Sequence, residues 1–112
     1  MESGNMLYET YHKGNYEVIK INETLTLSSN IDELNDIVDK LLENNIVDIA
    51  IFLKDDSYLY SATGSVLVRC WEAIKDCNGN LALVNINQGI RDFLSVIDFD
   101  SVIKIFNSEE EL

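Results

Sequence analysis

The sequence predicts an α/β fold built on a mixed, mostly parallel sheet with helices packed on it. Two β-compatible segments joined by a short turn open the chain, and apolar helical stripes then alternate with apolar strand-like runs. The resulting order, β-β-α-β-α-β-α-β, implies parallel strands connected by right-handed crossovers after the opening hairpin. Because 112 residues suffice for one hydrophobic core but not for two, we expect a single domain over residues 1–112.

The hairpin and the first helix are predicted from local patterns. Residues 6–12 and 16–21 are strand-like, and Lys13-Gly14-Asn15 between them suits a tight turn. Asn30 and Glu33 have the spacing of a capping box, in which each side chain binds a backbone N–H at a helix start. A surface helix is therefore expected over residues 31–44, with one apolar stripe formed by Ile31, Leu34, Ile37, Val38, Leu41 and Leu42.

The middle of the chain predicts a central strand followed by a long helix. Residues 46–53 are almost continuously apolar and rich in β-branched side chains, which is typical of a strand covered by helices on both faces. A helix is expected over residues 62–77, where helical spacing relates Val66, Cys70, Ala73, Ile74 and Cys77. Asn78 and Gly79 then tolerate the left-handed conformation that a helix end requires.

The remaining elements are shorter. Residues 81–86 indicate another buried strand, residues 101–106 a final strand, and a short helix between them is indicated by Ile90, Phe93, Leu94 and Ile97. Cys70 and Cys77 lie seven positions apart on one predicted helix, hence about 10 Å apart and beyond the reach of a disulfide. We expect both to be reduced thiols in the core.

The charge balance limits the choice of partner. A formal net charge of −12 disfavours binding to a nucleic-acid backbone or an anionic membrane surface, and favours a protein partner with a basic patch. The longest apolar run is far shorter than a membrane span, and the amino terminus lacks the basic start and apolar stretch of a leader. The sequence therefore predicts a soluble, cytoplasmic protein that does not insert into a membrane.

Catalysis finds little support in the sequence. His12 is the only histidine, and no spacing places a serine, cysteine or carboxylate beside it. Asp55 and Asp56 supply too few oxygen ligands for a metal ion, and the glycines match neither a Walker loop nor a dinucleotide fingerprint. We therefore predict no enzyme activity, no cofactor and no metal; an enzyme acting at the turn after a parallel strand is the least supported hypothesis.

The turn Ser61-Ala62-Thr63-Gly64 carries the functional prediction. It places two hydroxyls at a helix start, where backbone N–H groups and the helix dipole favour negative charge. Two alternatives stay open: Ser61 is simply the N-cap of the helix, or Thr63 or Ser61 accepts a phosphate. Gly64 allows close approach, either of a partner or of a strand against which the helix packs.

The same segment has the features of a protein-binding surface. Tyr58 and Tyr60 flank the turn, and tyrosine is enriched among the residues that dominate interface energies. On a helical wheel, Val68 falls away from the apolar stripe and is expected to be exposed. The predicted partner-binding residues are Tyr58, Tyr60, Ser61, Ala62, Thr63, Gly64, Ser65 and Val68.

Two stretches and the order of the elements resemble the STAS domain of bacterial anti-sigma factor antagonists over nearly the whole chain. The stretches are Tyr58-Leu59-Tyr60-Ser61-Ala62-Thr63-Gly64 and Gly79-Asn80-Leu81-Ala82-Leu83-Val84-Asn85. The resemblance implies a STAS-like fold. It also implies a regulator of transcription that works by partner switching and captures an anti-sigma factor of the serine/threonine kinase type.

The turn departs from the motif of that family, which reads Asp-Ser-Ser-Gly or Asp-Ser-Thr-Gly and is phosphorylated on its first serine. Here Ser61 stands in place of the aspartate and Ala62 in place of the acceptor. The resemblance therefore implies either a constitutive binder or a switch moved to Thr63 or Ser61. The lost motif residues favour a second hypothesis, a non-phosphorylated STAS scaffold in a larger signalling or lipid-transport complex. The sequence does not indicate the oligomeric state.

Overall fold

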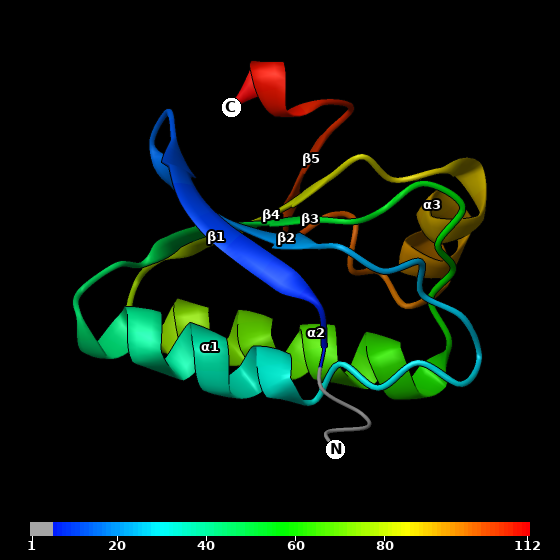
Figure 1. Cartoon of the computed structure of the whole chain (residues 1–112), viewed down its shortest axis with the longest axis horizontal. Helices are drawn as coiled ribbons and strands as arrows, with labels where there is room; N and C mark the ends of the chain where they lie inside the picture. The colour runs from blue at the N-terminus through cyan, green and yellow to red at the C-terminus, as the bar shows by residue number, and fades with distance from the viewer. Residues whose placement is uncertain (1–5) are drawn as a thin grey trace.

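The protein is described by a computed structural model that covers residues 6–112. Five strands form one sheet in the order β1-β2-β3-β4-β5, with β1 antiparallel to β2 and every other neighbouring pair parallel (Figure 1). The strands are β1 (Tyr8–Lys13), β2 (Tyr16–Ile21), β3 (Asp48–Phe52), β4 (Asn80–Val84) and β5 (Lys104–Phe106). The predicted α/β class and the mixed, mostly parallel sheet are confirmed.

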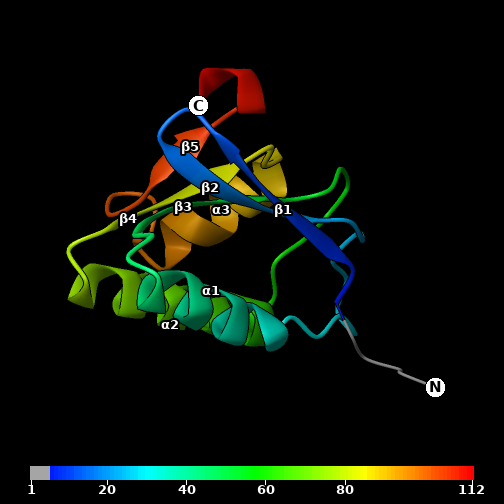
Figure 2. The same cartoon turned by 60° about the vertical axis from the view of Figure 1, so that its left-hand side comes forward.

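All three helices cover the same face of this sheet. They are α1 (Glu33–Glu43), α2 (Ser61–Asp76) and α3 (Gln88–Val96), and Figures 1 and 2 show them on one side, with the carboxyl-terminal 3₁₀ turn (Glu109–Glu111) on the other. The register places Ile19, Ile51 and Leu83 in one row across the sheet, and each of these side chains is fully buried in the main core. The core therefore lies between one sheet face and the three helices.

The prediction that residues 46–53 form a strand covered by helices on both faces is wrong. Because β2 to β5 follow chain order across the sheet, crossovers of one hand place every helix on the same side. The opposite face is buried by other means. A smaller cluster of Val18, Ala50, Ala82 and Val84 is covered by large side chains of the strands and of the carboxyl terminus, namely Tyr11, Tyr16, Phe52, Phe106 and Leu112.

The start of α1 differs from the predicted capping box. The Asn30 Oδ1 accepts a hydrogen bond from the Asp32 backbone N–H at 2.8 Å, which holds a turn before the helix rather than capping it. The Glu33 carboxylate accepts from the Met6 backbone N–H at 3.1 Å and so fastens the segment before β1. The helix consequently begins at Glu33 instead of residue 31.

Each helix ends in a Schellman motif that contains no glycine in the left-handed position. Asn45, Asn78 and Asp98 follow α1, α2 and α3 with φ angles of 63°, 61° and 57°. At the end of α2, the Gly79 N–H donates to the Ile74 carbonyl at 2.9 Å, and the corresponding bonds close the other two helices. The left-handed conformation predicted at Asn78 is confirmed.

Helix ends, left-handed residues and turns explain why three strands are shorter than predicted. The Ile46 N–H is used to close α1, so β3 begins at Asp48 rather than at residue 46. Asn85 has a φ of 65° and ends β4 at Val84, before the predicted residue 86. The predicted final strand over residues 101–106 is reduced to Lys104–Phe106, because a turn precedes it.

The two cysteines have different environments. Cys70 is buried in the core, where its Sγ donates to the Asn35 Oδ1 at 3.5 Å, as expected for a core thiol. Burial, assisted by the charge of Asp39, raises the pKa of the Cys70 thiol to about 12. Cys77 is exposed, contrary to expectation, because it is the last residue before the left-handed turn at Asn78.

Iodoacetamide at neutral pH is expected to alkylate Cys77 alone in the folded protein and both cysteines in concentrated urea. The reactive species is the thiolate, and the raised pKa of Cys70 keeps it protonated as well as inaccessible. Peptide mass spectrometry after a timed reaction measures the two sites separately. Equal labelling of Cys70 and Cys77 in the native protein would contradict the described burial.

Candidate functional site

The loop that leads from β3 to α2 is held in place by a buried serine. Ser57 is fully buried, and its Oγ accepts a hydrogen bond from the Leu25 backbone N–H at 2.9 Å. The next residue, Tyr58, donates its N–H to the Leu25 carbonyl at 3.0 Å. The Asn87 Nδ2 donates to the Ser57 carbonyl at 2.7 Å. Segments before α1 and before α3 therefore position the turn formed by residues 58–64, hereafter the 58–64 turn.

Neither Ser57 nor Asn87 was among the residues predicted for the site. Asn87 is the N-cap of α3, where its Oδ1 accepts from the Ile90 N–H at 2.9 Å. An asparagine just before an apolar helical stripe is a recognisable sequence signal for that role. Nothing local in the sequence marks Ser57, because its partner Leu25 lies on a different loop.

The first turn of α2 is capped by Thr63 and not by Ser61. The N-cap is Tyr60, whose backbone N–H donates to the Thr63 Oγ1 at 2.9 Å. The Thr63 hydroxyl in turn donates to the Tyr60 carbonyl at 3.1 Å, and this side chain is only 3% exposed. Ser61 is the first helical residue and is exposed, and its carbonyl accepts a hydrogen bond from the Ser65 hydroxyl at 2.8 Å. The alternative in which Ser61 is the N-cap is therefore wrong.

Replacing Thr63 with valine is expected to lower the free energy of unfolding by about 1–3 kcal/mol, because the partly buried hydrogen bond between the Tyr60 N–H and the Thr63 hydroxyl is lost. Thr63→Ser keeps the hydroxyl and is the matched control, with a smaller expected loss. Urea denaturation measures both. If valine and serine destabilise the protein equally, the capping role assigned to the Thr63 hydroxyl is contradicted.

The eight predicted partner-binding residues come together at one end of α2 but differ in exposure. Five are exposed: Tyr58, Tyr60, Ser61, Ala62 and Ser65. Thr63 and Gly64 are buried, so they shape this surface without presenting a side chain to a partner. Val68 is half-buried and packs against the core, whereas full exposure was expected. The helical wheel failed at Val68 because side chains of α3 and of the turn after it lie along this flank of α2.

Gly64 lets the Phe93 ring of α3 approach α2 closely, and a larger residue would require that ring to shift. A Cβ on Gly64 would lie 2.6 Å from the Cζ of Phe93, a distance that real side chains avoid. The close contact at Gly64 lies within the chain, but it is with a side chain of α3 and not with a strand as expected. The Phe93 ring consequently lies beside the 58–64 turn.

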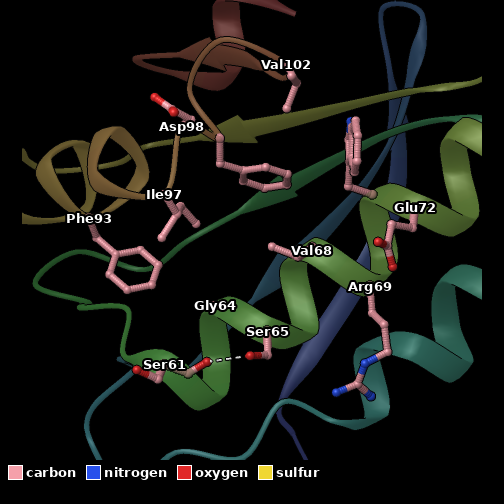
Figure 3. A pocket seen from close by; sticks show the side chains of 12 residues that line it. Ser61, Gly64, Ser65, Val68, Arg69, Glu72, Phe93, Ile97, Asp98 and Val102 are labelled. Carbon is pink, nitrogen blue, oxygen red and sulfur yellow. Dashed lines mark hydrogen bonds between the residues drawn. The ribbon is translucent and has the colours of Figure 1, made fainter.

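A groove of about 640 Å³ runs between α2 and the segment formed by α3 and the turn after it (Figure 3). We call it the α2–α3 groove. Figure 3 shows Gly64 and Val68 on the α2 side, facing Phe93 of α3 and Ile97 just after it. Val102 lies at the far end of the groove. The complete lining is Ser61, Gly64, Ser65, Val68, Arg69, Trp71, Glu72, Phe93, Ile97, Asp98, Phe99 and Val102. Ser61 thus belongs both to the turn and to the groove.

The contribution of residues 93–102 to this surface was not predicted. An apolar stripe along a helix predicts which of its side chains are buried. It does not predict whether the flanks of two neighbouring helices leave a groove between them. Ile97 and Val102 remain 41% and 47% exposed at the groove. The sequence assigns Ile97 to a helix and Val102 to a strand. Only the structure shows that both side chains are exposed at the groove.

The other polar residues considered from the sequence lie apart from this surface. His12 and Glu17 face each other across the β1–β2 hairpin, with 3.6 Å between the His12 Nδ1 and a Glu17 carboxylate oxygen. The Asp55 carboxylate accepts from the Asn85 Nδ2 at 2.7 Å, at the carboxyl ends of the strands. Residues 6–112 contain no group of three or more histidine, cysteine, aspartate or glutamate side chains placed to bind a metal ion. No helix within that range is long and apolar enough to cross a membrane.

Comparison with known proteins identifies a family for nearly the whole chain. The family model described as the STAS domain matches residues 8–112. No curated protein sequence matches the chain significantly. Solved structures similar to this chain were found as well, and they include proteins of the same kind.

Two of these structures are from Thermotoga maritima. An NMR structure has a TM-score of 0.75 at 21% identity and covers 99% of this chain and 89% of its own. A crystal structure of a candidate anti-sigma factor antagonist has a TM-score of 0.74 at 21% identity, covering 93% of this chain and 89% of its own. An anti-sigma factor antagonist (STAS) domain protein from Planctomyces limnophilus has a TM-score of 0.70 at 21% identity, with 93% and 92% covered. Because the sequence identity is 21% in each case, these structural similarities establish the fold alone.

Proposed function

Because this chain belongs to the STAS domain family, we propose that it acts as an antagonist of an anti-sigma factor. In this proposal it captures an anti-sigma factor of the serine/threonine kinase type through the 58–64 turn and the first turns of α2. Two of the similar solved structures carry the name of anti-sigma factor antagonists, which supports this class of partner. In this role the protein is a soluble regulator and catalyses no reaction.

The observation that carries this proposal is a rigid, partly aromatic surface at the amino-terminal end of α2. Tyr58 and Tyr60 are 53% and 39% exposed on either side of Leu59, which is buried. The Ser57 and Thr63 hydroxyls accept hydrogen bonds from the backbone N–H groups of Leu25 and Tyr60, and these bonds hold the backbone that carries the two rings. Little conformational entropy is then lost on binding, and exposed tyrosines on a fixed backbone are typical of interface hot spots.

Of the two hydroxyls considered as phospho-acceptors, we assign the acceptor to Ser61. Ser61 is exposed, whereas the Thr63 hydroxyl is buried and occupied on both sides by the Tyr60 backbone. A kinase could reach Thr63 only by unwinding the start of α2. A phosphate on Ser61 would lie at the first helical position, where the dipole contributes about 0.3–1 kcal/mol at an exposed site.

Binding is tested by isothermal titration calorimetry with a purified anti-sigma factor of the serine/threonine kinase type from the same organism. Tyr60→Ala is expected to weaken binding about tenfold or more, the cost of losing one hot-spot side chain. Tyr8→Ala is the matched control, because Tyr8 is 38% exposed but lies on β1. Equal affinities for the two variants and the unmodified protein would refute the proposed surface.

The acceptor is tested by incubating the protein with that anti-sigma factor and Mg-ATP, followed by mass spectrometry. We expect one phosphate, located on Ser61, which Ser61→Ala abolishes and Thr63→Ser retains. A phosphate on Thr63, or none at all, would remove the assignment to Ser61. Binding without any phosphate would describe a constitutive antagonist.

The second candidate function is that of a scaffold subunit without a phosphorylation cycle. The observation in its favour is Ala62, which is exposed at the position where the family motif carries its acceptor serine. A stable native complex containing sensor or transporter subunits, and lacking an anti-sigma factor, would favour this function over the first.

A further inference from the structure

We propose that the α2–α3 groove receives a basic amphipathic segment of the protein partner, with large aliphatic side chains inside the groove and lysine or arginine on its flanks. This inference rests on the proposed function in one respect, because Ser61 is shared by the groove and the 58–64 turn. A partner bound at the turn would therefore also extend along the groove.

Much of the lining of the groove is apolar. Ile97 and Val102 are 41% and 47% exposed, and Val68 and Phe93 are half-buried beside them. Trp71 and Phe99 form the inner wall, with their rings edge to face and 5.8 Å between centroids. An apolar hollow bounded by two helices matches the groove that accepts the apolar face of a third helix.

The rim of the groove carries charged side chains. Glu72 of α2 and Asp98 after α3 contribute carboxylates to the lining, and Asp100 is exposed nearby in sequence. The single cationic residue in the lining is Arg69, and Figure 3 shows its guanidinium directed away from Phe93 and Val102. Arg69 also borders a separate hollow with Asn35 and Asp39. The rim is therefore acidic.

An acidic rim on a chain of net charge −12 selects the occupant. Lysine and arginine flanking the apolar anchors of a partner would be attracted to the rim and would gain encounter rate and specificity. A second copy of this chain is disfavoured, because it would bring the same excess of negative charge to the groove. Charge complementarity thus favours a basic partner over self-association.

Trp71 supplies an internal reporter for occupancy. It is the only tryptophan in the chain, and it lines the groove. Among residues 6–112 its Nε1 is the only buried side-chain nitrogen or oxygen atom without a hydrogen-bond partner. A segment that enters the groove changes the surroundings of the indole, so its emission reports binding directly.

The first experiment titrates the full chain with a synthetic helical peptide that has leucine on one face, lysine on the other and no tryptophan. We expect a saturable change in Trp71 emission that weakens with added salt. A peptide with glutamate in place of lysine should produce none. The double variant Ile97→Ser, Val102→Ser is expected to weaken the lysine peptide about tenfold or more.

Two control variants separate the groove from the general negative charge. Val96→Ser changes a neighbouring side chain that is 83% exposed and outside the groove, and it should bind the lysine peptide as the unmodified protein does. Asp76→Asn with Glu110→Gln removes two exposed charges elsewhere, and should matter less than Glu72→Gln with Asp98→Asn. If groove and control variants bind alike, the inference is overturned.

A second experiment distinguishes failure of this inference from failure of the proposed function. The anti-sigma factor is titrated against Ile97→Ser, Val102→Ser and against Tyr60→Ala. Unchanged affinity for the groove variant with lost affinity for Tyr60→Ala overturns the groove inference and leaves the proposed function standing. Groove-dependent binding of the lysine peptide, without any binding of the anti-sigma factor, supports the groove and removes the proposed function.

Discussion

Replacing Phe99 with alanine is expected to lower the free energy of unfolding by about 3–5 kcal/mol, the usual cost of removing a buried aromatic ring. Phe99 is 5% exposed and packs edge to face against Trp71, with an interplanar angle of 84°. It also follows the left-handed Asp98, so its ring lies where the end of α3 is closed over the core. The lost contacts therefore affect both the core and the inner wall of the α2–α3 groove.

Urea denaturation followed by circular dichroism measures this loss, and Trp71 emission provides an independent reading. Without the Phe99 ring, the indole gains solvent and its emission should shift to longer wavelength in the folded state. Val96→Ala is the control, because Val96 is 83% exposed and its truncation should change stability by less than about 0.5 kcal/mol. Similar stabilities for Phe99→Ala and Val96→Ala would contradict the packing described for residue 99.

Replacing Gly79 with alanine is expected to lower the free energy of unfolding by about 1–3 kcal/mol through overpacking. The added Cβ would overlap the Val47 carbonyl oxygen and lie 2.8 Å from the carbonyl carbon. These are backbone atoms just before β3, and the same Val47 carbonyl accepts the Asn80 N–H at 3.0 Å. No side-chain rotation relieves the contact, so the strain must be distributed between β3 and β4.

Gly89→Ala is the matched control for that substitution. Its Cβ would meet the Cε1 of the exposed Tyr58 ring at 3.1 Å, and the ring can move aside. Because residue 89 lies within α3, alanine also gains helix propensity of up to about 1 kcal/mol. Thermal and urea unfolding should therefore show a loss for Gly79→Ala only. Equal stability of the two variants would mean that the β3–β4 junction is looser than described.

The sequence was sufficient to predict the elements whose signals are local. The long apolar stripe placed α2 within one residue of Ser61–Asp76 at either end, and the Asn78-Gly79 pair marked where that helix stops. Strand β2 was predicted with its observed bounds, Tyr16–Ile21. Regular periodicity and left-handed residues are properties of neighbouring positions, which explains why they can be read directly.

Predictions that depended on distant parts of the chain were the ones that failed. Asn30 and Glu33 have capping-box spacing, but Met6 competes for the Glu33 carboxylate. Val68 is predicted to be a surface residue when α2 is considered alone, but Phe93 of α3 and the following Ile97 lie across the groove from it. The spacing of apolar residues within one helix does not predict which other element will lie along the flank of that helix.

For the 58–64 turn, the place in the fold was predicted better than the hydrogen bonds of its side chains. The 58–64 turn was identified from its hydroxyls and tyrosines, and the structure places it at the start of α2 as expected. The sequence could not assign the capping hydroxyl, because both Ser61 and Thr63 stand near the helix start. The N-cap lies one residue earlier than Ser61, at Tyr60, and this shift leaves Ser61 exposed and buries Thr63.

The helix ends leave the protein room for thermostable redesign. Asn45 and Asn78 hold a left-handed backbone that crowds any Cβ, at roughly 1–2 kcal/mol per residue, and glycine avoids this crowding although it costs roughly 0.5–1 kcal/mol of added chain entropy. Both positions lie at the carboxyl ends of α1 and α2, remote from the tyrosines and the acidic rim. An engineered chain could therefore tolerate higher temperatures while its recognition properties stayed those of the natural sequence.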